Sequence, residues 1–307
     1  MEKKKLLKNK IVDTLPVLYL ETVILMVLGQ FLGNFVLGIP VGIAYARNPE
    51  ILNSAFLNTT LMYVIFWGIW AVALFWIGIR KRNRPILQAV GTKPQGNNWK
   101  YLLFGLVLGF ALNGFCILIA WLHHDIVLTY DAIHPLWFVV VFLTVFIQSS
   151  AEELLCRGFL YQKLRRSYKN PVVAIVGNAL LFALLHLDLA QSITALVCGI
   201  FLGWLVERSG SILPGMLLHF INNTLAFLSL YLRQYAPEQL AVVYELILLV
   251  ALPLAALFLV WRVKAQGFSF SAGLRGGMEP LAVFTSLPYT VCVLFLMGLT
   301  VYLYRVG

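Results

Sequence analysis

Two adjacent carboxylates and a guanidinium lie at the end of a long apolar stretch. The run from Leu136 to Ile147 leads into Glu152, Glu153 and Arg157. A charge at membrane depth costs about 2.5–3.5 kcal/mol or more to insert, so charges retained there usually serve a function. Residues four apart share a helix face, whereas neighbours point about 100° apart. We therefore expect Arg157 to pair with Glu153 and to leave Glu152 facing a cavity, where a carboxylate can act as a general base. The alternative is that both acids are ordinary charges at the water boundary.

Two histidines and an asparagine lie in other apolar runs. Phe182 and His186 are four apart, as are His219 and Asn223, so each pair would share one face of a helix. We expect Phe182 to pack against the imidazole and not to react. At 1.5 Å per residue, Glu152, His186 and His219 lie roughly 16, 22 and 12 Å from the predicted cytoplasmic helix ends. These overlapping depths permit a shared site in a cavity open to the cytoplasm.

The composition is that of a membrane protein. Hydrophobic residues make up 61% of the 307 residues and charged residues 12%, whereas soluble domains are about 45–50% apolar and about 25% charged. The net charge of +10 is not the signature of a nucleic-acid binder, because the basic residues cluster between apolar runs, where they act as topology signals. The sequence predicts an all-α, polytopic transmembrane helix bundle.

About eight to nine spans are predicted. Ser192–Val206 is short enough to be a re-entrant or tilted helix instead of a full span. Lysines and arginines concentrate in alternate loops, which predicts a multi-pass protein of the cytoplasmic membrane with its N-terminus inside. We divide the chain into N-terminal helices (1–135), a core (136–232) and C-terminal helices (233–307). The predicted spans are Leu15–Ala46, Ala55–Ile79, Tyr101–Leu122, Leu136–Leu160, Pro171–Leu187, Ser192–Val206, Ile212–Leu232, Leu240–Val263 and Leu281–Tyr304.

Pairs of glycines four apart predict close packing of helices within the subunit. The cysteines form no CxxC pair, which argues against a zinc knuckle or a disulfide framework. The glycine pairs are Gly29/Gly33, Gly105/Gly109 and Gly199/Gly203.

Three motifs together resemble a known family over about residues 136–232. This is the CPBP family, the CAAX protease and bacteriocin-processing family, also called Abi, which includes CAAX prenyl protease 2. Each motif alone is common, but the three in this order on membrane helices are specific. They are EExxxR at Glu152, Glu153 and Arg157, FxxxH at Phe182 and His186, and HxxxN at His219 and Asn223.

The resemblance implies an intramembrane metalloendopeptidase with a helical core. It implies that Glu152 and His186 activate the attacking water, that His219 and Asn223 complete the site, and that the remaining residues of the first motif support it. Other intramembrane protease patterns are missing, since the chain contains no HExxH zinc motif and no GxSxG serine turn.

Two mechanisms remain open at this point. In the first, Glu152, His186 and His219 bind Zn²⁺ and leave a fourth position for water. In the second, which needs no metal, Glu152 is the base with His186 assisting, and His219 and Asn223 donate to the oxyanion.

The predicted partners are membrane lipid and a membrane-associated or hydrophobic peptide or protein, with no nucleic acid. Alternative functions are a non-enzymatic bacteriocin-immunity or regulatory scaffold, and a transporter that uses the polar groups as a relay.

Overall fold

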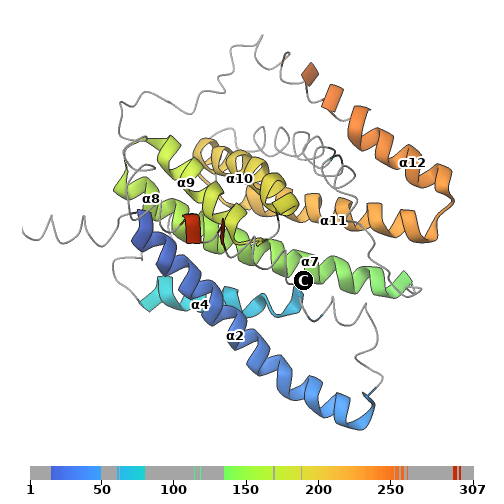
Figure 1. Ribbon diagram of the computed structural model, residues 1–307, viewed down its shortest axis with the longest axis horizontal. Helices are drawn as coiled ribbons and strands as arrows, with labels where there is room; N and C mark the ends of the chain where they lie inside the picture. The colour runs from blue at the N-terminus through green and yellow to red at the C-terminus, as the bar shows by residue number, and fades with distance from the viewer. Residues whose placement is uncertain are drawn as a thin grey trace, which may run out of the picture.

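The computed structural model is helical throughout the part of the chain that it describes (Figure 1). The described residues contain no strand, which confirms the predicted all-α bundle. Four helices are long and apolar enough to cross a membrane, and two shorter helices are apolar. The chain is therefore an integral membrane protein. The predicted spans Tyr101–Leu122 and Leu281–Tyr304 lie mostly outside the described residues, which are 15–49, 61, 63–79, 114, 118, 135–168, 170–187, 189–251, 253–255, 257–258, 261, 293–295 and 297–298.

The first two described helices cross at glycines. Helix α2 (Leu15–Arg47) matches the first predicted span, and α4 (Trp67–Ile79) is the end of the second. A Cβ atom on Gly68 would lie 2.1 Å from the carbonyl oxygen of Gly29 and 2.6 Å from the amide nitrogen of Gly33. The close packing predicted for this glycine pair is confirmed, because only glycine lets the two backbones approach so closely.

The central helix changes its winding immediately after the acidic pair. Helix α7 (Pro135–Glu153) continues as the π-helix η2 (Leu154–Leu160), which is buried throughout, and then as α8 (Tyr161–Ser167). The amide of Tyr161 donates to the carbonyl oxygen of Cys156, five residues earlier. That oxygen also accepts from Asn178 Nδ2 at 2.6 Å. Such π turns are frequent at functional sites.

Two tightly packed helices follow. Asn170 caps α9 (Pro171–Leu184), since its side chain accepts from the Val172 amide. Helix α9 is shorter than predicted and ends before His186. Its end is fixed partly by Ser192, whose hydroxyl donates to the carbonyl oxygen of Ala183. Helix α10 (Leu189–Ser209) is longer than the predicted Ser192–Val206 and is long enough to cross a membrane.

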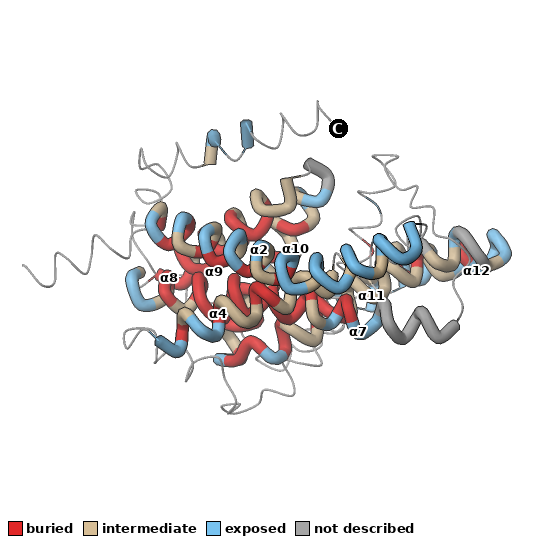
Figure 2. The backbone as a smooth tube through the Cα atoms, turned by 90° about the horizontal axis from the view of Figure 1, so that it is seen from below, coloured by how far each residue is buried: buried red, intermediate tan, exposed pale blue. Residues whose placement is uncertain are grey.

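The remaining described helices are α11 (Leu213–Tyr235), α12 (Glu238–Leu246) and the π-helix η3 (Ile247–Ala251). Helix α11 packs along α7, where the ring of Phe220 meets Phe142 and Phe146 edge to face. Buried residues gather in the middle of the bundle, whereas α12 is mostly exposed or half-buried (Figure 2). The site described below lies beside this buried centre.

Candidate active site

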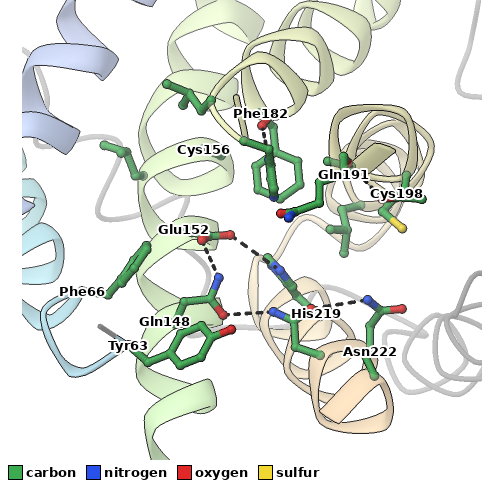
Figure 3. Close-up of a pocket in the computed structure, with 18 of the residues that line it drawn as sticks. Tyr63, Phe66, Gln148, Glu152, Cys156, Phe182, Gln191, Cys198, His219 and Asn222 are labelled. Carbon is green, nitrogen blue, oxygen red and sulfur yellow. Dashed lines mark hydrogen bonds and ion pairs between the residues drawn. The ribbon is translucent and has the colours of Figure 1, made fainter. Parts of the chain in front are cut away.

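One pocket is lined by all four side chains predicted to do chemistry. It has a volume of about 530 Å³, and its walls come from α2, α4, α7, η2, α10 and α11 and from the end of α9. Glu152 projects into it from α7, His219 and Asn223 from α11, and His186 from the turn after α9. Figure 3 shows Glu152 and His219 facing each other across this space. The structure thus brings together groups that are up to 71 residues apart in the chain, from Glu152 to Asn223.

Beside the pocket, Glu153 and Arg157 form the predicted ion pair. Their side chains are fully buried, and Arg157 Nη1 lies 2.8 Å from Glu153 Oε1. The guanidinium carbon lies 4.4 Å from the centre of the Phe182 ring, and Nη2 donates to the carbonyl oxygen of Gly199 at 3.4 Å. The pair therefore ties the π-helix to α9 and α10. A Cβ at position 199 would lie 3.1 Å from the Cα of Ala179, so Gly199 also favours the close packing of α10 on α9.

His219 lies between the two carboxylates of the acidic pair. Its Nδ1 lies 2.9 Å from Glu153 Oε1, and its Nε2 lies 3.6 Å from Glu152 Oε2. A carboxylate can only accept, so Nδ1 carries a proton and donates it. On the opposite side, a lone pair on Nε2 would face a carboxylate oxygen. That contact is favourable only when Nε2 is also protonated, or when water or a cation lies between the two atoms.

The sequence did not predict this arrangement. It assigned Glu153 to Arg157 alone, whereas the structure adds His219 as a second partner. The sequence analysis also expected Glu152 to have no partner. In the structure, one of its two carboxylate oxygens has a hydrogen-bond partner. Within the described residues, Glu152 Oε2 is buried without a hydrogen bond, while Oε1 accepts from Gln148.

His186 is held in one tautomer by the backbone. Its Nδ1 lies 2.8 Å from the carbonyl oxygen of Phe182 and must donate to it, which leaves a lone pair on Nε2. The Phe182 ring stands edge-on to both imidazoles, with centroids 4.9 Å from His186 and 5.7 Å from His219. Phe182 thus packs against the imidazole, as expected from the sequence.

Gln148 is a member of the site that the sequence analysis missed. Its Nε2 donates to Glu152 Oε1 (Figure 3). Its Oε1 accepts from Asn223 Nδ2 at 2.9 Å. Asn223 Nδ2 also lies 3.4 Å from the hydroxyl of Ser149. Gln148 could have been identified from the sequence, because it is a polar amide within an apolar run, one helical turn before Glu152.

The donor set fits zinc only in part. Glu152 Oε2 and His219 Nε2 face each other as a carboxylate–imidazole pair would around a cation, and His219 Nδ1 has the carboxylate partner typical of a metal-binding histidine. However, no three histidine, cysteine, aspartate or glutamate side chains of the described ranges are grouped so that they could hold an ion. The predicted zinc site at Glu152, His186 and His219 therefore stays a prediction.

The segment that carries the site is similar to a known family of endopeptidases. Residues 134–225 match the family model described as "Type II CAAX prenyl endopeptidase Rce1-like". This confirms the resemblance to the CPBP family for the segment that carries the four pocket residues.

A relative from Bacillus subtilis (strain 168), the uncharacterized protein YyaK, is 30% identical over 150 residues. That alignment covers 47% of this chain and 49% of the relative, so the chain matches about half of its length. No solved structure matches the chain.

Proposed function

We propose that this protein is an intramembrane endopeptidase that hydrolyses an amide bond in a membrane-associated or hydrophobic peptide. The match of residues 134–225 to an endopeptidase family supports the reaction class. The observation that carries the proposal is the pair of opposed atoms in the pocket. Glu152 Oε2 is a buried acceptor that has no hydrogen bond among the described residues, and it lies 3.6 Å from His219 Nε2. A water molecule that contacts both atoms from the pocket side would lie against a base.

Glu152 is the general base in this mechanism. Its Oε2 takes a proton from the bound water as the water oxygen attacks the scissile carbonyl carbon. The resulting C–O bond turns the carbonyl oxygen into an oxyanion. The intermediate then collapses, the C–N bond breaks, and the proton held by Glu152 passes to the leaving nitrogen. His186 assists, because its Nε2 lone pair can accept a second hydrogen bond from the same water.

His219 and Asn223 stabilise the oxyanion. His219 lies 2.9 Å from the Glu153 carboxylate through Nδ1, and it can donate from Nε2 when its ring is protonated on both nitrogens. Asn223 donates from Nδ2, and its longer contact, to Ser149 at 3.4 Å, is the one that a substrate oxygen would replace. Removing one such donor typically lowers kcat by about 10²- to 10³-fold.

The rest of the pocket suits a hydrophobic peptide. Its walls away from the polar groups include Met26, Phe66, Ile69 and Phe227. Apolar side chains of a substrate would bury their surface there, which contributes about 25 cal/mol per Å². We propose precursors such as leader, pheromone or bacteriocin peptides, or prenylated C-termini, as the substrate class.

The test is a cleavage assay with purified protein in lipid, using a prenylated CAAX peptide and an apolar leader-like peptide as probes. Run in ¹⁸O-labelled water, cleavage should add one heavy oxygen to the new carboxyl terminus, and His186→Ala should slow the reaction. Gln162→Leu on α8, which does not line the pocket, is the matched control. Full-rate cleavage by His186→Ala would refute the assigned site. Absence of cleavage of any probe by the wild type would favour the scaffold alternative.

A further inference from the structure

We infer that Gln148 is a positioning residue that locks the base and the oxyanion donor into one orientation. This inference rests on the proposed function, because it assigns Gln148 a part in the same reaction. The supporting observation is that one side chain contacts both groups. Gln148 bonds to Glu152 through its amide nitrogen and to Asn223 through its amide oxygen.

The direction of the Gln148 amide follows from its neighbours. The Glu152 carboxylate can only accept, so the atom that faces it must be the Gln148 nitrogen. The Gln148 oxygen is then turned to α11, where it accepts from Asn223 Nδ2 at 2.9 Å. The Asn223 amide is fixed in turn, and its oxygen accepts from Asn222 Nδ2 at 3.4 Å. The orientation of the oxyanion donor therefore depends on the carboxylate of the base.

Burial makes the link stiff. Gln148 is 7% exposed, and its oxygen also accepts from the Ser149 hydroxyl at 3.4 Å. Leaving a buried amide without hydrogen-bond partners costs about 1–3 kcal/mol. The Gln148 side chain therefore has no other conformation of comparable free energy. Because Gln148 and Glu152 are one helical turn apart on α7, the donated bond also holds Glu152 Oε1 against its own helix. Oε2 is thereby directed to His219.

The consequence for catalysis is separate from substrate binding. Gln148 bonds to the two side chains that act in the transition state. Small misplacements of such groups cost up to about 10²-fold in rate. Gln148→Leu should therefore lower kcat by about 10- to 100-fold and leave KM unchanged, with Gln162→Leu at the wild-type rate.

Gln148→Glu tests the direction of the amide. A carboxylate at this position can still accept from Asn223, but it cannot donate to Glu152 and repels it. The groups that face this position are Glu152 and Ser149 on α7 and Asn223 on α11. Gln148→Glu should therefore lower kcat at least as far as Gln148→Leu does.

A melting experiment tests the contact without any activity. Gln148→Leu and Asn223→Leu each break the same hydrogen bond and leave its other partner unpaired. The Tm loss of the double variant should therefore be smaller than the sum of the two single losses. Additive losses, or a Gln148→Leu kcat equal to that of the wild type, would overturn the inference. If the wild-type chain cleaves no probe, the proposed function fails and the melting cycle alone decides whether Gln148 couples α7 to α11.

Discussion

The buried ion pair beside the pocket gives a prediction about stability. Arg157→Met should be strongly destabilising, because it leaves the Glu153 carboxylate in a fully buried position without its counter-charge. Breaking one partner of a buried pair costs about 3–5 kcal/mol. The variant also loses the contact over the Phe182 ring and the bond to the Gly199 carbonyl.

The expected loss lies near the lower end of that range. Glu153 still has the Nδ1 donor of His219 at 2.9 Å, so it is not left wholly unpaired. We therefore expect a loss of about 3 kcal/mol, which at about 2 °C per kcal/mol is a fall in Tm of about 6 °C. Thermal unfolding of the purified protein in detergent, followed by circular dichroism, measures it.

Two further variants make this prediction refutable. Glu153→Gln combined with Arg157→Met removes both charges while an amide oxygen can still accept from His219, so most of the lost stability should return. Arg233→Met is the control, because its ion pair with Glu245 is 41% exposed on the arginine side and should contribute under about 1 kcal/mol. Equal melting of Arg157→Met and the control, or a double variant less stable than the single one, would refute the reasoning.

Three more outcomes are expected. Gly29→Ala should cost about 1–3 kcal/mol in thermal unfolding, because its Cβ would lie 2.4 Å from the α4 backbone. Gly42→Ala should not destabilise, because its Cβ would meet no atom of the described residues within 4 Å. Burial, and then a hydrogen bond to Glu207, raise the pKa of Tyr161 above its usual value of 10.0. The stability from this neutral phenol is present below about pH 10 and is lost as the pH rises further, so Tyr161→Phe should flatten the alkaline loss of Tm. Chelator treatment should leave peptide cleavage unchanged; loss of activity that Zn²⁺ restores would instead support the zinc route.

Hydrophobicity and residue spacing predicted the features that depend on a single helix. The bundle follows from the apolar runs, and α2 begins and ends within a residue of the predicted span. The pairing of Glu153 with Arg157 follows from their spacing of four. The close approach of another helix at Gly29 and Gly33 follows from their spacing of four, whereas the identity of that helix, α4, does not.

Contacts between helices could not be read from the sequence in the same way. The position of His219 between two carboxylates depends on the packing of α11 against α7, which no spacing within either helix encodes. His186 lies beyond the end of α9 because the chain turns there, with Leu187 at φ 54°. Gln148 was missed because its importance comes from Asn223, which is 75 residues away in the chain.

The measurement that tests the central claim most directly is the rate of peptide cleavage by Glu152→Gln. This substitution keeps the shape of the side chain and removes its negative charge, and with it the ability to take a proton from water. We predict that kcat falls by about 10²- to 10⁴-fold while Tm stays at the wild-type value. Cleavage at the wild-type rate by a fully folded Glu152→Gln protein would contradict the account, because the base would then lie elsewhere.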